Sequence, residues 1–194
     1  VIFSSSKYNH DSNATSLIHL NGNEILYLCP DGERLFCVNK GGDSEQTFGE
    51  RPIKDEMSNA YNVFQGKIAY HTARKILVYS SFNFPYLSVY SRLGEGDWSS
   101  VKELKGDWDY TISEGKLRFS TDSKKGAMEL ALTDDYIVLL QRDTKVEGSL
   151  SKQEMKGRNV ASLPHSLFVY DYDLNLKKII NMPFPMLRLC GDDQ

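Results

Sequence analysis

The chain has 194 residues, of which 40% are hydrophobic and 25% charged, and its formal net charge is −3. This composition supplies a sizeable core and excludes a disordered chain, while the length accommodates one or two domains at a prior of roughly 150 residues each. The acidic balance and the scattered lysines and arginines exclude an electrostatic surface for nucleic acid. No run approaches the roughly 20 apolar residues of a membrane span, and the amino terminus lacks the pattern of a signal peptide. Because the chain begins with Val1 rather than Met, we expect a processed form or a fragment.

The first part of the chain predicts a meander of short strands. Residues 16–20, 24–29 and 34–39 are extended candidates separated by Asn-Gly-Asn and Pro-Asp-Gly-Glu, two sequences typical of turns. Residues 46–50 are the best position for a fourth, outer strand. Together they predict a four-stranded antiparallel unit.

The same pattern returns twice along the chain. The second series of extended candidates is 61–64, 67–72, 75–81, 87–90 and 99–105, and the third is 127–132, 136–141, 166–171 and 176–181. The period is irregular because of two insertions. Residues 108–121 predict an extra hairpin that turns at Ser113-Glu114-Gly115, and residues 144–165 form a long polar segment in which 151–158 allow one or two helical turns. A four-stranded unit that repeats at roughly 40 to 50 residues is typical of β-propeller blades, since one blade alone cannot bury its two faces.

The stretch 166–181 shows this architecture most clearly. Leu167 and Val169 point to one face of a strand, while Phe168 and Tyr170 point to the other. Both faces are apolar, which predicts an inner strand covered on both sides. A polar turn at 173–175 and a less apolar strand at 176–181 then complete an outer hairpin.

Residues 127–182 resemble the TolB-like six-bladed β-propeller proteins of Bacteroidetes. The resemblance rests on DDYIVLLQRD, a long polar insertion and SLFVYDYDLNLKKIINM, and it is weaker over 16–104. It implies an all-β fold, an incomplete β-propeller built of four-stranded antiparallel blades. We place the blades at 16–52, 60–105 and 107–182, and the start of a further blade at 183–194 with a strand at 186–190.

The resemblance also carries expectations about location and assembly. It implies a periplasmic or cell-surface lipoprotein without an established activity, and it offers no catalytic motif that can be transferred to this chain. Six blades need well over 300 residues, so we expect blades to be missing here. If the chain were complete, its exposed blade edges would favour self-association.

The three cysteines, Cys29, Cys37 and Cys190, are too few for a disulfide framework. A two-residue turn at Asp31-Gly32 would place Cys37 opposite Leu26, whose side chain faces away from that of Cys29. This argues against a Cys29–Cys37 bridge and favours buried free thiols. A three- or five-residue loop would change the facing.

The sequence contains no complete motif for a metal or a cofactor, and we predict neither. Asp171, Asp173 and Asn175 have the spacing of a calcium loop, but Leu176 and Met182 stand where that loop needs Gly and Glu, which favours a hairpin turn. The four histidines show no metal-ligand spacing, although a zinc site assembled from distant residues stays open. No nucleophile elbow, phosphate loop or dinucleotide fingerprint occurs.

Carboxylate pairs offer a route to catalysis that the sequence leaves open. Asp107 with Asp109, and Asp134 with Asp135, are adjacent enough to suggest acid–base chemistry, and a glycosidase needs two convergent carboxylates. Adjacency in sequence does not show convergence, so polar turns flanking strands are the favoured interpretation. We assign no catalytic residue.

Two loops are the best candidates for binding, because propeller ligands usually meet the loops at one end of the ring. The first carries Phe82, Phe84 and Tyr86, whose aromatic faces suit sugars or partner side chains. The alternative, that these rings pack between blades, is favoured. The second is 144–165, with Arg158 and His165, for which the alternative of a simple solvated loop is favoured.

Three functions follow from these observations. The first is a non-enzymatic, envelope-associated propeller that binds a protein or carbohydrate ligand through its loop face. The second is a glycan-active hydrolase or lyase whose carboxylates meet in the central channel. The third is a structural subunit that assembles by blade-edge pairing.

Overall fold

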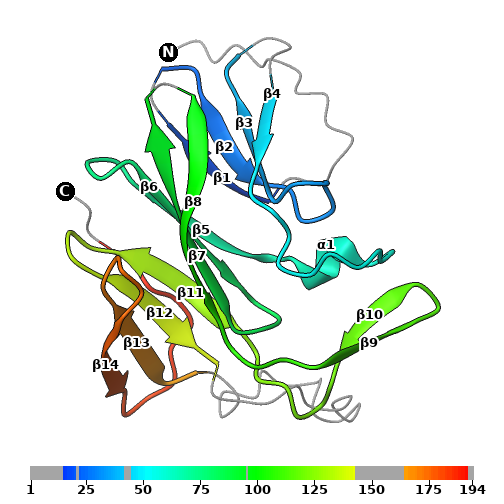
Figure 1. Ribbon diagram of the computed structural model, residues 1–194. Helices are drawn as coiled ribbons and strands as arrows, with labels where there is room; N and C mark the ends of the chain where they lie inside the picture. Colours follow the sequence, from blue (N-terminus) through cyan, green and yellow to red (C-terminus); the bar gives the residue numbers. More distant parts are fainter. Residues whose placement is uncertain (1–14, 21, 42–44, 95, 143–163, 192–194) are drawn as a thin grey trace.

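The structure is a computed structural model, and it describes residues 15–20, 22–41, 45–94, 96–142 and 164–191 (Figure 1). Its strands form three four-stranded antiparallel sheets and one two-stranded hairpin. The elements are β1 (Thr15–His19), β2 (Ile25–Leu28), β3 (Phe36–Asn39), β4 (Glu45–Phe48), α1 (Ala60–Val63), β5 (Gly66–His71), β6 (Ile76–Ser81), β7 (Tyr86–Leu93), β8 (Asp97–Lys105), β9 (Tyr110–Ser113), β10 (Lys116–Phe119), β11 (Ala127–Leu132), β12 (Ile137–Gln141), β13 (Ser166–Tyr170) and β14 (Leu176–Asn181).

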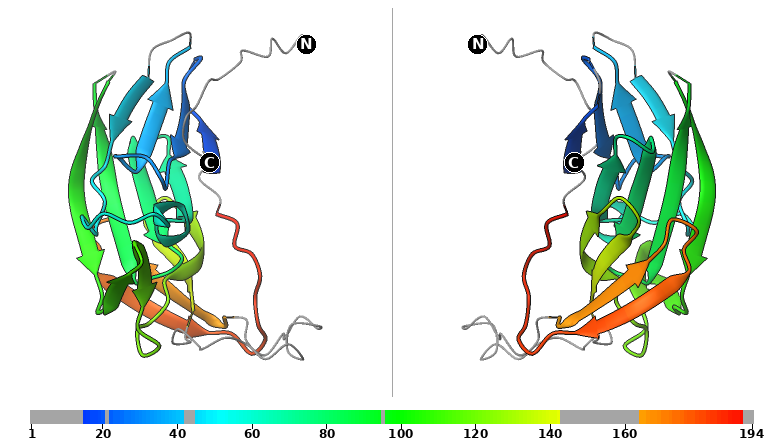
Figure 2. Two further views of the ribbon diagram at one scale, coloured as in Figure 1. Left: turned by 90° about the vertical axis from the view of Figure 1, so that its right-hand side faces the viewer. Right: turned by 90° about the vertical axis from the view of Figure 1, so that its left-hand side faces the viewer.

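Each large sheet is a meander in which every strand pairs with the next one along the chain. Blade 1 has the order β1-β2-β3-β4, blade 2 the order β5-β6-β7-β8, and blade 3 the order β11-β12-β13-β14. Figure 2 shows the three sheets following one another along an arc, with β8 on the convex side and β1 on the concave side. The first strands of neighbouring blades contact each other, β1 with β5 and β5 with β11. The all-β fold built of four-stranded antiparallel blades is therefore confirmed.

Blade 2 is covered on both faces, and strand β6 shows why. Leu77 and Tyr79 point to one face and pack against blade 1, whereas Val78 points to the other face and packs against blade 3. All three side chains have 0% exposure. Since side chains alternate along a strand, the continuous apolar run at 76–79 needs a neighbouring layer on each side.

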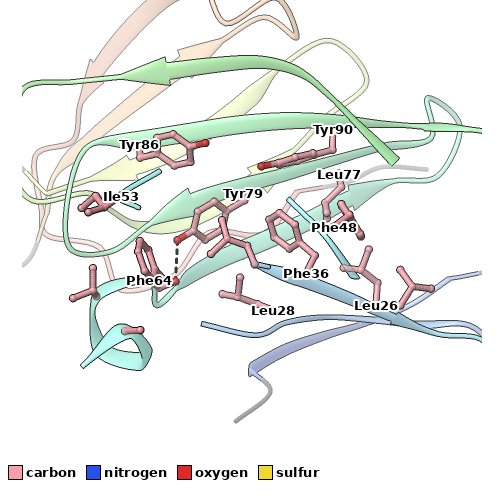
Figure 3. Close-up of a cluster of buried hydrophobic side chains, with 14 of the residues drawn as sticks. Leu26, Leu28, Phe36, Phe48, Ile53, Phe64, Leu77, Tyr79, Tyr86 and Tyr90 are labelled. Carbon is pink, nitrogen blue, oxygen red and sulfur yellow. Dashed lines mark hydrogen bonds between the residues drawn. The ribbon is translucent and has the colours of Figure 1, made fainter. Parts of the chain in front are cut away.

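The core between blades 1 and 2 is rich in aromatic rings (Figure 3). Phe36 lies at its centre, with ring centroids 5.0 Å from Phe48, 5.0 Å from Tyr90 and 5.6 Å from Tyr79. The hydroxyl of Tyr79 donates a hydrogen bond to the carbonyl of Phe64 at 2.9 Å. Aromatic pairs in tilted and edge-on arrangements stabilise a core beyond the area they bury.

The core between blades 2 and 3 is mainly aliphatic. Val78, Leu87 and Val89 of blade 2 pack against a set of buried residues from blade 3, namely Ala127, Leu130, Leu132, Ile137, Leu139 and Tyr170. Arg74, in the turn between β5 and β6, contacts the turn between β11 and β12. Its Nε donates to the carbonyl of Asp134 at 2.8 Å, and its Nη2 lies 3.4 Å from Asp135 Oδ1. The carboxylate pair Asp134–Asp135 therefore belongs to a turn of blade 3 that is bound to blade 2 through Arg74.

The extra hairpin predicted at 108–121 is confirmed as β9 and β10. Ser113 pairs with Lys116, so the turn has two central residues, Glu114 with φ 54° and Gly115 with φ 70°. Positive φ at both positions is what a tight hairpin turn of this kind requires. The hairpin is held to the segment before α1 by Asn59, whose side chain donates to the carbonyl of Leu117 and accepts from its N–H, both at 2.9 Å.

Residues 61–64 were expected as a strand, and this prediction is wrong. They lie in and just after α1, a single helical turn. Ala60, Val63 and Phe64 are all buried, which is the spacing of one helical face rather than of a strand. The helical-turn prediction at 151–158 falls outside the described residues.

The facing predicted for the first cysteine pair is also wrong. Cys37 pairs with Tyr27 rather than with Leu26, and Cys29 donates its N–H to the carbonyl of Leu35 at 2.7 Å. The connection between β2 and β3 is therefore longer than a two-residue turn. A register shift of one residue moves every side chain to the other face, so Cys29 and Cys37 share a face.

Blade 3 is covered less completely than the sequence predicted. Strand β13 is an inner strand, between β12 and β14, as expected. However, Leu167 and Val169 face away from blade 2 and are only partly buried. Residues 183–191 form no strand where one was expected at 186–190, although Arg188 Nη1 lies 2.6 Å from Glu129 Oε1 on β11. That segment adds no strand to blade 3. Besides this ion pair, its Met186 N–H donates to the carbonyl of Pro164 at 2.9 Å, and its Gly191 backbone packs closely on that of Leu132.

Candidate functional site

Several chain connections meet at one end of blades 2 and 3, which we call the loop end. Residues 82–85 join β6 to β7, and β8 finishes opposite them because Lys105 pairs with Tyr86. The N–H of Gly106 donates to the carbonyl of Pro85 at 2.8 Å, and that of Gly126 donates to the carbonyl of Phe82 at 3.0 Å. The loop end thus gathers residues 82–85, both ends of the segment 106–126 and the adjoining end of β12.

Gly126 allows the chain to pass close to blade 2 as it enters β11. A Cβ atom at this position would lie 2.0 Å from the carbonyl oxygen of Ser81 and 2.5 Å from that of Phe84. No side chain fits there without a shift of the backbone. Because glycine has no side chain, the start of β11 can pack directly against the loop of blade 2.

A pocket of about 490 Å³ opens at the loop end between blades 2 and 3. We call it the loop-end pocket. Its apolar lining includes Leu87, Ala127, Leu139, Phe168 and Tyr170, and its charged lining consists of Lys105, Asp107, Asp122, Lys124 and Arg142. Pockets of this volume with an apolar floor and a few polar groups are typical of small-ligand sites.

Arg142 is the most distinctive charge in this pocket. Its guanidinium carbon lies 5.8 Å from the centroid of the Phe82 ring, within the range of a cation–π contact. Burial lowers the pKa of Arg142, although a guanidinium still keeps its proton at neutral pH. Among the described residues, no carboxylate forms an ion pair with it. The pocket therefore contains a partly desolvated cation whose hydrogen-bond donors face no anionic partner within the described ranges.

The two lysines of the loop-end pocket differ from Arg142, because one is paired and the other is exposed to solvent. Lys105 forms an ion pair with Glu103 at 2.9 Å, while Lys124 is exposed. Asp107 and Asp122 line the loop-end pocket and also an adjoining hollow of about 310 Å³, which Asp109 shares. In the part of the chain that the structure describes, no three His, Cys, Asp or Glu side chains are placed to hold a metal ion.

The aromatic residues predicted for binding are divided between the core and the loop end. Phe84 has 0% exposure and packs against Trp108 at 5.1 Å and Phe119 at 5.3 Å. The ring of Tyr86 lies in the aromatic core between blades 1 and 2, and burial raises its pKa (Figure 3). Phe82 is half-buried, with Arg142 on one side and Lys67 Nζ at 5.9 Å from its centroid. Tyr86 also lines the loop-end pocket. Phe82 is not one of the lining residues, but its ring contacts Arg142, which is.

The two candidates from the second loop are placed as follows. Arg158 lies outside the described residues. His165 is exposed at the loop end, directly before Ser166, which pairs with Gln141, and its carbonyl accepts the N–H of Met182 at 2.9 Å. Sequence reasoning missed Arg142, whose only signal is its position immediately after an apolar strand and before a long polar segment.

The turn after β13 is stabilised by its own side chains, as the hairpin interpretation predicted. Asp171 Oδ1 accepts the N–H of Asp173 at 3.0 Å and that of Asn175 at 2.9 Å. Its Oδ2 lies 2.8 Å from Lys177 Nζ. The Lys177 and Asn175 side chains hold the pKa of Asp171 well below its ordinary value.

Comparisons with known proteins support the fold alone. No family model matches the sequence, and no curated protein matches it either. A solved structure that it resembles is the β-propeller domain of Cps50 (Swd1) from Myceliophteria thermophila, with a TM-score of 0.51 and 8% sequence identity. The match covers 93% of this chain and 47% of that one, so the chain spans about half the length of the propeller domain. At this identity the likeness shows a β-propeller fold and nothing finer.

The described residues contain one helix, α1, of four residues. Nothing helical in that part of the chain has the length and hydrophobicity to cross a membrane.

Proposed function

We propose that this protein is a non-enzymatic β-propeller that binds an acidic saccharide in the loop-end pocket. The observation that carries the proposal is Arg142, a partly buried guanidinium with no ion-pair partner among the described residues, held over Phe82 at the pocket wall. An arginine in this position presents a planar fork of N–H donors that matches a carboxylate. Its partial desolvation strengthens the attraction to an anion relative to the same pair in water.

The remainder of the pocket favours a small ligand with one acidic group. The volume of about 490 Å³ is that of a small-ligand site rather than of a flat protein interface. Phe168 and Tyr170 line the pocket and supply aromatic surface suited to the non-polar side of a sugar. Asp107 and Asp122 also line it, and their negative charges disfavour a polyanion. A saccharide that carries a single uronic acid satisfies all three features.

Binding assays with matched oligosaccharides test this proposal. We expect wild-type protein to bind uronic-acid oligosaccharides in isothermal titration calorimetry and to bind their neutral counterparts at least tenfold more weakly. Arg142→Met should weaken acidic binding by about 10- to 100-fold, as expected for loss of a hydrogen-bonded charge. Arg34→Met, an exposed arginine on blade 1, serves as the control and should bind as wild type does. Equal affinity for acidic and neutral sugars, or an unchanged affinity in Arg142→Met, would contradict the proposal.

The alternative function, a glycan-active hydrolase or lyase, is favoured by one observation. Asp107 and Asp122 both line the loop-end pocket and the adjoining hollow, so two carboxylates reach the same space. If the protein cleaves glycans, chromatography should detect shortened products, and both Asp107→Asn and Asp122→Asn should abolish them. Stable binding without product release supports the non-enzymatic proposal.

We also propose a TolB-like relationship, an envelope location and self-association through blade edges as features of the whole protein. The first two are supported by the resemblance of residues 127–182 together with the propeller fold. The third is supported by the outer strand β14, which pairs only with β13 among the described strands and carries the exposed apolar residues Leu176 and Ile179. Cell fractionation with an antibody and sedimentation of the purified protein test location and assembly separately. Recovery in the cytoplasm or a monomer at all concentrations would contradict them.

A further inference from the structure

Cys29 and Cys37 lie next to each other on one face of blade 1. Tyr27 pairs with Cys37 across β2 and β3, and Cys29 follows Tyr27 by two residues. Residues two apart in an extended segment point to the same side, so the two cysteines are diagonal neighbours on one face. This face is opposite to the one that packs on blade 2 through Leu26, Leu28 and Phe36.

The two sulfur atoms are in contact. The distance between Cys29 Sγ and Cys37 Sγ is 2.9 Å, and neither cysteine is bridged to another residue in the structure. A disulfide bond has a sulfur–sulfur distance of about 2.05 Å, so an approach of less than about 1 Å would complete it. Cys37 lies within the ladder of β2 and β3, and the hydrogen bond from the Cys29 N–H to the Leu35 carbonyl holds the backbone of Cys29 beside it.

The pair lies in a small buried cluster of its own. Cys29 has 0% exposure and Cys37 5%, and they pack with Tyr27 and Ile25. The hydroxyl of Tyr27 donates a hydrogen bond to Glu45, the first residue of β4. The contact with Cys29 and burial together raise the pKa of Cys37. A raised pKa keeps the thiolate fraction small and slows its attack on an oxidant, which suits a structural bridge that forms slowly and persists better than a catalytic dithiol.

We propose that Cys29 and Cys37 form an intrachain disulfide that joins β2 to β3 when the protein meets a disulfide oxidant such as oxidised glutathione. The thiolate of one cysteine attacks a sulfur of the oxidant, forms a mixed disulfide and releases one glutathione thiolate. The thiolate of the second cysteine then attacks the first cysteine's sulfur and releases the second glutathione. Two protein thiols are oxidised and one glutathione disulfide is reduced to two thiols, so electrons and protons balance.

Cys190 provides an internal control for this reaction. It is exposed in the segment after blade 3 and has no second cysteine beside it within the described residues. Its sulfur contact is the carbonyl of Gly191 at 3.6 Å. Oxidation should therefore join Cys29 to Cys37 and leave Cys190 without an intrachain partner.

Mass spectrometry of the intact chain tests the proposal. The protein is equilibrated with oxidised glutathione or with dithiothreitol, then denatured and alkylated. We expect no alkyl groups on Cys29 and Cys37 of the oxidised wild type. Cys190 should carry either an alkyl group or a glutathione mixed disulfide. A proteolytic map should show these two residues linked. Three alkylated cysteines after oxidation, or a link to Cys190, would overturn the proposal.

Thermal unfolding supplies a second readout. A disulfide that closes a short loop lowers the conformational entropy of the unfolded chain and so stabilises the folded one. For a chain of this length, the oxidised wild type should melt about 5 °C above the reduced form. The matched variants Cys37→Ser and Cys190→Ser separate the pair from the third cysteine. Oxidation should leave the melting temperature of Cys37→Ser unchanged and raise that of Cys190→Ser as it does in wild type. If Cys37→Ser does not fold, the peptide map of wild type still decides the matter.

Discussion

The two interfaces between blades share the strands of blade 2 but differ in the side chains that fill them. Blade 1 and blade 2 meet through aromatic rings, with Phe36 in contact with both Tyr79 and Tyr90 and all three almost fully buried. Blade 2 and blade 3 meet through smaller aliphatic side chains, and their interface opens at the loop end into the pocket that contains Arg142. Aromatic rings fill the centre of the first interface, and the hollows beside it are lined mainly by polar and charged residues. The pocket of the second interface has an apolar floor that can face a ligand.

The comparison indicates how a repeat fold separates stability from binding. Large rings packed edge to face fill the centre of the gap between blades 1 and 2. Between blades 2 and 3 the aliphatic core continues into the floor of the loop-end pocket, where charged groups from the connecting segments lie beside apolar surface. We therefore expect substitutions in the first interface to change stability most and substitutions at the end of the second to change binding.

The largest effect is expected at the centre of the first interface. Phe36→Ala removes a ring that is fully buried between Phe48, Tyr79 and Tyr90. The cavity should lower the free energy of unfolding by about 3 to 5 kcal/mol. Urea denaturation measures this directly. A loss below about 1 kcal/mol would mean that the aromatic core does not hold blades 1 and 2 together.

Leu139→Ala is the matched test in the second interface, and its effect should be smaller. Leu139 is 4% exposed and lines the loop-end pocket, so the truncated site adjoins space that is already open. We expect a loss of about 2 kcal/mol, at the low end for such substitutions. The same urea titration provides the value. A loss equal to that of Phe36→Ala would remove the contrast between the two interfaces.

Arg142→Met should change stability little, in contrast to its effect on binding. The substitution keeps an apolar side chain against Phe82 and removes a partly buried charge that has no ion-pair partner in the described part of the chain. We expect the free energy of unfolding to stay within about 0.5 kcal/mol of wild type, or to rise slightly. Differential scanning calorimetry gives the answer. A loss of several kcal/mol would show that Arg142 has a structural role.

The smallest effect concerns the turn of blade 3, away from both interfaces. Because the pKa of Asp171 is depressed in the folded state, its contribution to stability is present above its ordinary value of 3.8 and is lost as the pH falls below that value. Asp171→Asn should therefore be less stable than wild type at pH 6, and the difference should shrink at pH 3. Urea midpoints at the two pH values measure it, with the exposed Asp97→Asn as control. A difference that grows on acidification would contradict the assignment.

Local pattern was sufficient to predict most of the blades. Apolar runs such as 76–79 and 137–140 and turn residues such as Gly115 report directly on strands and hairpins, because side-chain alternation and turn dihedral angles are local properties. The failures also have local causes. Residues 61–64 are short enough to fit either a strand or a helical turn, and the loop after Cys29 is longer than its Asp-Gly sequence suggested.

The candidate site was predicted only in part. The sequence placed binding on the loops at one end of the blades and named three rings there. Phe84 is buried in the core, Tyr86 is buried but lines the loop-end pocket, and Phe82 reaches the pocket only through its contact with Arg142. It gave no reason to choose Arg142, since a single arginine after a strand has no motif. The distance between Arg142 and Phe82 depends on how blade 3 is placed against blade 2.

By itself, then, the sequence determined the strand pattern, the three repeated units and the inserted hairpin, because each depends on neighbours close along the chain. Only the tertiary structure decided which aromatic rings are buried, which charge lacks a partner among the described residues, and that Cys29 and Cys37 touch. These features depend on strand register and on the stacking of one blade on the next. Both are set by contacts between residues far apart in the sequence, and a one-residue change in a loop is enough to alter them.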